Sequence, residues 1–229
     1  MLAVASYSGG LLVTTVTPPR KKKRRALGQN PAIRASRRKE LIEAAIHVIA
    51  RHGYAGCTVG RVAQRAGASQ GLMNFHFKSI DLLLEAAFNH LADEFDEAWK
   101  ARVSEAGAEP WDRITAMIEA YFGAEVFTAE KLAVWFTFWV DSGLRDAFRS
   151  AAVRVERRYH RDLQAEIARL VASKKDAAHV IGMLTALVDG YWLQALLYPK
   201  TFKSKQAVQS CLTWLRLAVE NAAKQGRSA

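Results

Sequence analysis

Hydrophobic residues recur at steps of three and four along nearly the whole chain from Arg34 onward, which is the period of an amphipathic helix. Leu41 and Ala45, for example, belong to a stripe that predicts a first helix over about residues 36–52. Gly53 follows directly, in the position where a left-handed cap ends a helix.

Two short helices are predicted next. Thr58 is a favourable N-cap for a helix over residues 58–66, and Gly67 then ends it. Ser69 can cap a third helix that ends near Phe77. A helix of about eight residues, a glycine turn and a second short helix together have the spacing of a helix-turn-helix.

The rest of the chain predicts longer helices, and Asp81 lies in the first turn of the next one, where a carboxylate suits the helix dipole. The expected helices cover about residues 80–104, 111–127, 129–142, 145–172, 175–197 and 205–223. No segment shows strand alternation flanked by turn dipeptides. We therefore predict an all-α fold of nine helices, with a three-helix head and a larger helical bundle.

The charge of the chain is divided unevenly and supports the same division into parts. The net charge is +6 over residues 1–33, again +6 over residues 34–80, and −1 over residues 81–229. A basic head on a neutral body indicates a polyanion-binding module joined to something else. We expect a disordered basic extension over residues 1–33, a DNA-binding domain over residues 34–80 and a separate helical body over residues 81–229.

Several other classes of protein are disfavoured. The two cysteines have no CxxC spacing and fit a reducing cytoplasm, and no apolar run is long enough to predict a transmembrane helix. Common catalytic, nucleotide-binding and metal-binding motifs are missing, so neither an enzyme nor a cofactor is indicated. Two alternative hypotheses remain open. The chain could be a helical enzyme or ligand carrier with a basic N-terminal extension, or a protein that binds DNA or a membrane surface nonspecifically through the segment "RKKKRR".

The segment "TVGRVAQRAGASQGLMNFHFKSIDLLL" resembles the DNA-binding head of the TetR family of bacterial repressors. The residues that match the family pattern are Thr58, Val62, Ala63, Ala66, Gly67, Ser69, Gly71, Met73, Phe77 and Leu83. The chain departs from the pattern at Asn74 and His76, where tyrosines are usual, and at Ile80, where a lysine is usual. Operator preference should therefore not be transferred from a generic member of the family.

The resemblance implies roles for the exposed residues of this segment, because amides hydrogen-bond adenine edges and basic or hydroxyl groups hold phosphates. The residues that would face the DNA bases are Gln70, Asn74 and Phe75. The residues that would hold backbone phosphates are Arg37, Arg38, Thr58, Ser69, His76 and Lys78. His76 could instead pack on Phe77, which is expected to be core, and Arg37 could lie on a solvated face.

Aromatic residues are concentrated in two segments of the body. "AVWFTFWVDSG" places Trp135, Phe138 and Trp139 on one helical stripe, and "LVDGYWLQALLY" places Asp189 and Trp192 on another helix. Aromatic residues at this spacing are usually core. Rings gathered around a carboxylate nevertheless suit a quaternary ammonium, through cation–π attraction of about 0.5–2 kcal/mol per contact.

Residues 130–197 are similar to the choline-responsive betaine regulator (BetI) branch of the same family. That resemblance implies a repressor of choline and glycine betaine genes that is released by choline or betaine aldehyde. The candidate ligand contacts are Trp135, Phe138, Trp139, Asp189 and Trp192. Asp189 could alternatively cap a helix or form a salt bridge, and Trp192 could lie in a dimer interface. The alternative function is a TetR-type repressor that senses an unrelated small molecule, such as a drug or a catabolic inducer.

The family resemblance also implies a homodimer, in which the last two helices pair with their copies. A two-fold dimer places two recognition helices about 34–36 Å apart and requires a near-palindromic operator in double-stranded DNA. We expect such a protein to be cytoplasmic, with no membrane partner.

Overall fold

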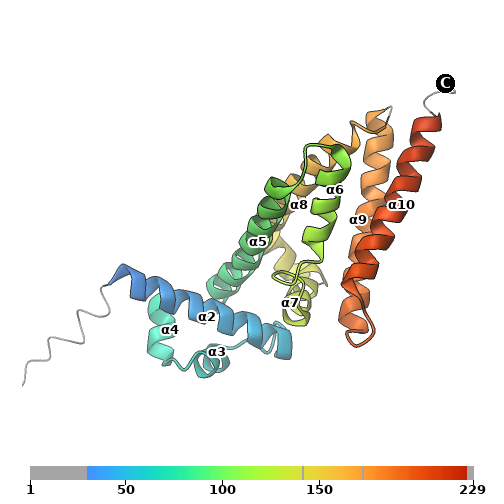
Figure 1. Ribbon diagram of the computed structural model, residues 1–229. Coiled ribbons are helices and arrows are strands. Elements are labelled where there is room, and N and C mark those ends of the chain that lie inside the picture. The colour runs from blue at the N-terminus through green and yellow to red at the C-terminus, as the bar shows by residue number, and fades with distance from the viewer. Residues whose placement is uncertain (1–29, 141, 172, 226–229) are drawn as a thin grey trace, which may run out of the picture. The chain divides into compact units, whose positions relative to one another are not determined.

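The computed structural model describes residues 30–140, 142–171 and 173–225, which form nine helices and no strand (Figure 1). The helices are α2 (Pro31–His52), α3 (Val59–Arg65), α4 (Gln70–His76), α5 (Ile80–Glu105), α6 (Pro110–Tyr121), α7 (Ala129–Val140), α8 (Ser142–Ile167), α9 (Lys174–Leu197) and α10 (Ser204–Gln225). The predicted all-α fold is therefore confirmed. Of the predicted basic extension, the first 29 residues lie outside the described chain.

The chain divides at Arg37 into two compact units, and each is described by itself. In the first unit α2 begins at Pro31, earlier than predicted, because Asn30 caps it: the Asn30 side-chain oxygen accepts a hydrogen bond from the Ala32 amide at 3.0 Å. Proline suits this first helical position since its missing N–H would have had no partner there.

In the second unit the predicted boundaries of the two short helices are confirmed. The Thr58 hydroxyl accepts from the Arg61 amide at 3.4 Å, and the Ser69 hydroxyl accepts from the Leu72 amide at 3.2 Å. Gly53 and Gly67 have φ angles of +66° and +60°, the left-handed conformation that ends a helix at glycine. Both starts of the helix-turn-helix, and the end of α3, are thus set by a residue suited to that position.

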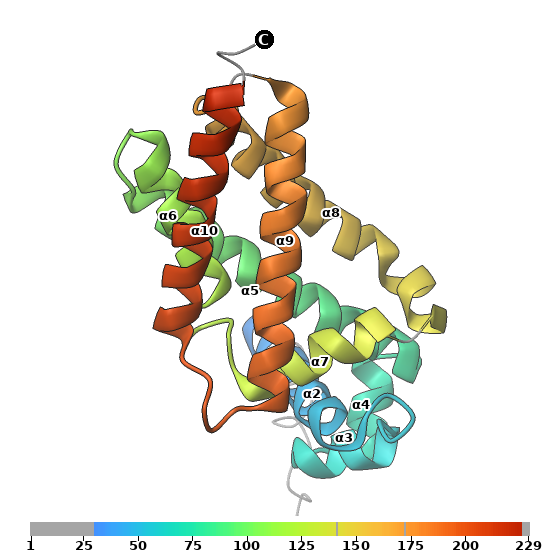
Figure 2. The ribbon, with the colours of Figure 1, turned by 90° about the vertical axis from the view of Figure 1, so that its right-hand side faces the viewer.

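The larger bundle is built around α5, which packs against α6 and α8. Helix α9 packs against α8 and α10, and α7 packs against α8 and α9. Figure 2 shows α9 and α10 side by side, with no other described helix in front of them. A continuous apolar core runs through this unit, and Trp99 on α5 is its largest fully buried side chain.

The expected helix over residues 111–127 is wrong at its end, because α6 stops at Tyr121. The Val126 and Phe127 amides both donate to the Gly123 carbonyl, at 3.1 and 2.8 Å, so the chain turns here. Phe122 and Val126 lie in this turn and are buried in the core. Their apolar side chains continue the helical pattern, so the sequence predicts a longer helix. The Thr128 hydroxyl then accepts from the Lys131 amide at 3.2 Å and begins α7.

Helix α9 is the one described helix that is long and apolar enough to cross a membrane, judged by length and composition. Two faces account for that composition. One packs in the core through residues such as Leu184 and Val188, and the other exposes Met183, Leu193 and Leu197. A core helix with a second apolar face can be as long and as apolar as a membrane span, so length and composition alone do not indicate a membrane span.

Candidate functional sites

The recognition helix α4 presents its predicted base-reading side chains to solvent. Gln70, Asn74 and Phe75 are exposed, and 59% of the surface of Phe75 is accessible. Met73 and Phe77 are buried in the core, as predicted for Phe77. An exposed apolar ring together with two exposed amides is suited to a major groove, where a thymine methyl is an apolar contact and adenine edges pair with amides.

The residues predicted to hold phosphates are also exposed, apart from His76, which is half-buried. The hydroxyl oxygens of Thr58 and Ser69 accept hydrogen bonds from backbone amides when they cap α3 and α4. Each O–H therefore remains able to donate to a phosphate oxygen. The His76 ring lies edge-on to Phe75, with 5.2 Å between centroids. Lys78 is exposed, and Arg37 is exposed on α2 within the first unit.

Arg38 and Arg61 have structural contacts in the head that the sequence did not predict. The Arg38 guanidinium lies over the Phe77 ring, 4.8 Å from its centroid, and Arg61 donates to the Gly56 carbonyl at 2.8 Å. Gly56 is required at that turn, because a Cβ there would overlap the His52 backbone and side chain. The Arg61–Gly56 hydrogen bond fixes the turn that leads into α3, and the Arg38–Phe77 contact joins α2 to the end of α4.

A cavity of about 220 Å³ lies in the larger bundle, between α5, α6, α7, α8 and α9. Six of its lining residues are Phe, Tyr or Trp, and its carboxylates come from α8 and α9. Its lining residues are Phe95, Tyr121, Trp135, Trp139, Glu156, Tyr159, His160, Thr185, Val188, Asp189 and Trp192.

The three predicted tryptophans form one cluster on the cavity wall. Trp139 and Trp192 are stacked, with 5.9 Å between their ring centroids, and Trp135 lies 6.4 Å from Trp192. Trp192 is 4% exposed, so it is buried inside the subunit, and its indole N–H has no hydrogen-bond partner among the described residues. Phe138 is not part of the lining; it is buried against Phe88, with 4.7 Å between centroids.

The cavity also contains two carboxylates. Asp189 lies in the middle of α9, where it cannot cap a helix, and it forms no ion pair with a side chain in the described part of the protein. Burial, followed by the negative charge of Glu156, raises the pKa of Asp189, whereas His160 lowers it. Burial also raises the pKa of Tyr121, with smaller contributions from both carboxylates. The three acidic groups line the same cavity.

A hydrogen-bonded pair completes the polar wall. His160 Nε2 and Thr185 Oγ1 lie 3.1 Å apart, and both side chains are half-buried. His160 stands one helical turn after Glu156 on α8, and Thr185 one turn before Asp189 on α9. The wall therefore has two levels, one of carboxylates and one of this hydrogen-bonded pair.

The sequence reasoning missed the contributions of α5, α6 and α8 to the cavity. On α8, Glu156, Tyr159 and His160 have the spacing of one helical face, which was the available signal. Phe95 and Tyr121 had no such signal, because buried aromatic residues on a helix are most often core.

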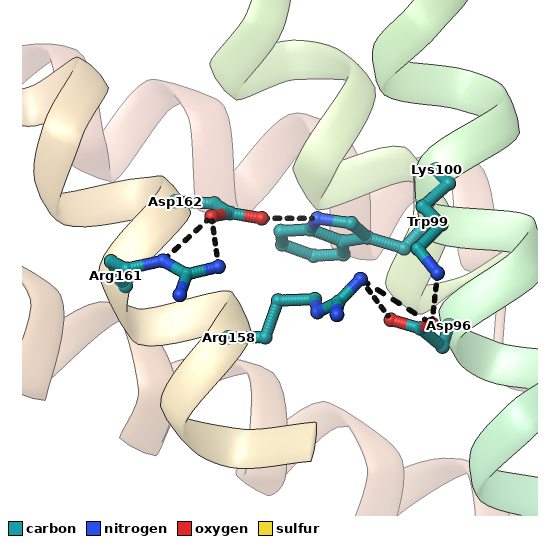
Figure 3. A network of polar contacts seen from close by, with 6 residues as sticks. All are labelled: Asp96, Trp99, Lys100, Arg158, Arg161 and Asp162. Atoms are coloured by element: carbon teal, nitrogen blue, oxygen red, sulfur yellow. Dashed lines mark hydrogen bonds and ion pairs between the residues drawn. The ribbon is translucent and has the colours of Figure 1, made fainter. Parts of the chain in front are cut away.

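Polar contacts join α5 to α8 next to the cavity (Figure 3). Arg158 pairs with Asp96 at 3.1 Å, and the Trp99 indole N–H donates to Asp162 at 3.3 Å. The ring of Trp99 also packs on Tyr159, with 4.4 Å between centroids. The cavity wall on α8 is thus tied to α5, the helix that directly follows the recognition helix.

A helix-turn-helix joined to a helical body with a small aromatic cavity is the arrangement of a ligand-responsive transcription regulator. Comparison with known families agrees with that class. Residues 41–87 match the bacterial regulatory proteins of the tetR family, and residues 110–219 match the C-terminal domain of BetI-type transcriptional repressors.

Individual relatives give the same result. The chain is 31% identical to the HTH-type transcriptional regulator BetI of Paraburkholderia phytofirmans over 187 residues, which cover 82% of this chain and 95% of that protein. A transcriptional regulator of Pseudomonas aeruginosa has a similar crystal structure, with a TM-score of 0.72 and 28% identity, covering 83% of this chain and 94% of that one. A regulator of Saccharomonospora viridis, solved in complex with choline, has the same fold, with a TM-score of 0.69, 21% identity and coverage of 80% and 96%.

The chain therefore belongs to the TetR family of transcriptional regulators, and within that family to the BetI-type repressors. It is a DNA-binding regulator and not an enzyme.

Proposed function

We propose that this protein represses genes for choline uptake or glycine betaine synthesis, and that a small quaternary ammonium such as choline releases it from its operator. The BetI name of its relatives and the choline complex of the Saccharomonospora viridis regulator support this proposal. We place its action in the cytoplasm, where the operator DNA lies.

The observation that carries the proposal is the chemistry of the cavity. Its lining combines six aromatic residues with Glu156 and Asp189, and the described lining residues include no lysine or arginine. A cation would lie against ring faces and near opposite charge, whereas an anion would meet two carboxylates. Its volume of about 220 Å³ is also below the ~300–1,000 Å³ typical of pockets for drug-sized ligands, which disfavours a bulky drug as the inducer.

We further propose that the protein acts as a homodimer through α9 and α10. Exposed apolar side chains on these helices support this, namely Met183, Leu193, Leu197 and Leu217. A two-fold pair would present two copies of α4 to a near-palindromic operator, with half-sites about 34–36 Å apart. In this arrangement residues 34–80 bind DNA, and residues 81–229 bind the ligand and the partner subunit.

Helix α5 gives the ligand a route to the DNA-binding head. Phe95 lines the cavity, and α5 begins at Ile80, directly after α4 and its C-cap. These two residues are about 22 Å apart along one continuous helix. A ligand that favours one position of α5 over another shifts the protein between DNA-binding and released states, to the extent that it binds one state more tightly.

Two binding measurements test the proposal. Isothermal titration of the full chain should detect choline and no binding of 3,3-dimethyl-1-butanol, its uncharged isostere, because the carboxylates and rings favour a cation. A gel-shift assay with DNA from upstream of neighbouring choline or betaine genes should show a complex that choline dissociates. Absence of choline binding, together with release by an unrelated compound, would contradict the proposed ligand and support the alternative function.

A further inference from the structure

The polar wall of the cavity has two levels that differ in charge. Glu156 on α8 and Asp189 on α9 both line the cavity and form one level. His160 and Thr185 form the other level and are joined directly at 3.1 Å. On each helix the two levels are one turn apart, or about 5.4 Å.

A ligand that used the whole wall would carry two different groups at a short separation. The carboxylate level suits a positive charge, which the tryptophans flank on α7 and α9. The His160–Thr185 level is neutral when the imidazole is unprotonated, so it suits an uncharged polar group. A cation with a short polar arm matches both levels.

The hydrogen-bonding capacity of Thr185 specifies that arm further. A threonine hydroxyl has one donor and two acceptor positions, and neutral histidine offers one donor and one acceptor. Whichever partner donates in the His160–Thr185 bond, Oγ1 keeps a lone pair that can accept from a ligand hydroxyl. A carboxylate arm offers no such donor and would also lie near two acidic side chains.

We propose that His160 and Thr185 form the specificity-determining subsite of this cavity, where Thr185 accepts a hydrogen bond from the hydroxyl arm of a cation whose charged end lies beside Glu156 and Asp189. The inference rests on the proposed function, since it assumes that the cavity binds a cation. It adds that the protein distinguishes a hydroxylated cation from one with no polar arm, and from a zwitterion whose arm is a carboxylate.

The test compares three ligands by isothermal titration with the full chain: choline, tetramethylammonium and glycine betaine. Choline carries the charge and the hydroxyl, tetramethylammonium carries the charge alone, and glycine betaine carries a carboxylate arm. Wild-type protein should bind choline more tightly than either of the others.

Thr185→Val should weaken choline binding by about 2- to 12-fold, the net effect of one hydrogen bond, and leave tetramethylammonium binding unchanged. Thr185→Ser keeps the hydroxyl and should retain the preference for choline. Thermal melting of both variants checks that the fold is intact, and a structural defect would weaken both ligands together.

The possible results separate the two proposals. Wild-type protein that binds neither choline nor tetramethylammonium contradicts the proposed function and this inference with it. A second result would overturn the inference and leave the proposed function standing. In that result the wild-type protein binds choline, and Thr185→Val weakens the affinities for choline and tetramethylammonium equally or changes neither.

Discussion

Single hydroxyls in the DNA-binding head serve two purposes at once. Thr58 and Ser69 accept hydrogen bonds from backbone amides and so begin α3 and α4. Their O–H groups remain able to donate, and both residues are exposed. The groups that define the ends of the helices are therefore also suited to hold phosphates, which fix the position of a protein on DNA without reading its sequence.

Asn74→Ala tests which residue on α4 reads the bases. We expect operator affinity to fall by about 5- to 150-fold, the range of one bidentate base contact, with little change for random DNA. Lys78→Ala is the matched control, since loss of a phosphate contact should weaken both DNAs alike and reduce the salt dependence. Fluorescence anisotropy with the two duplexes makes the comparison. Equal losses on both duplexes for Asn74→Ala would contradict a base-reading role.

Asp189 should make ligand binding depend on pH. Its pKa is raised in the free protein by burial and by Glu156, whereas a bound cation favours the ionised carboxylate. Binding should therefore release a proton, and choline affinity should rise as pH increases through the raised pKa and then level off. Titration calorimetry in buffers of different ionisation enthalpy measures this release.

Asp189→Asn is the control for that dependence, because it keeps the other titratable groups that line the cavity, namely Tyr121, Glu156, Tyr159 and His160. The variant should bind choline more weakly, with a flatter pH profile. Identical profiles for the variant and the wild-type protein would show that Asp189 does not titrate on binding.

The candidate cavity could be predicted from the sequence only in part. Trp135, Trp139 and Trp192 were found because large rings at helical spacing beside a carboxylate are unusual on a solvent-exposed face. Glu156 and His160 were missed because α8 is rich in charged residues, and a polar residue that faces a cavity has the same local pattern as one that faces water. Only the packing of α8 on α7 and α9 distinguishes the two.

At the scale of the elements, helix starts with a capping side chain were predicted more accurately than ends without a glycine stop. Thr58 and Ser69 fixed the short helices to within a residue. The end of α6 was missed because its next residues are apolar and buried, and only hydrogen bonds to the Gly123 carbonyl turn the chain there. Apolar periodicity reports burial, and burial continues through this turn.

Helix α7 provides a second link between ligand and head. Near its start Glu130 lies 2.7 Å from His47 on α2, and farther along the same helix Trp135 and Trp139 line the cavity. A shift of α7 on ligand binding would therefore act on α2 as well as on the cavity wall. This contact complements the route through α5.

Glu130→Gln should reduce the ratio of operator affinities measured without and with choline. The pair is partly exposed, with 30% and 44% of the two side chains accessible, so we expect a small effect of about 1.4- to 5-fold. Glu43→Gln, which removes an exposed pair with Lys39 inside α2, is the control and should leave the ratio unchanged. A ratio that Glu130→Gln does not alter would exclude this contact from the coupling.

At the scale of the whole molecule, the proposed dimer accounts for the exposed apolar face of α9 and α10. Leu193→Glu would place a charge in that interface without a partner, which is costly to bury. We expect the variant to sediment as a monomer in analytical ultracentrifugation and to lose operator affinity. Leu82→Glu makes the same substitution at an exposed leucine on α5 and should remain dimeric. A Leu193→Glu variant that stays dimeric would place the interface elsewhere.

In the proposed mechanism, one cavity and one DNA surface are coupled in the same molecule. The most direct measurement is the operator dissociation constant of the wild-type protein over a range of choline concentrations. A coupled repressor should bind its operator about 5- to 150-fold more weakly at saturating choline, and operator DNA should weaken choline binding by the same factor, because coupling between binding sites is reciprocal. An operator affinity that stays constant while choline fills the cavity would contradict the account.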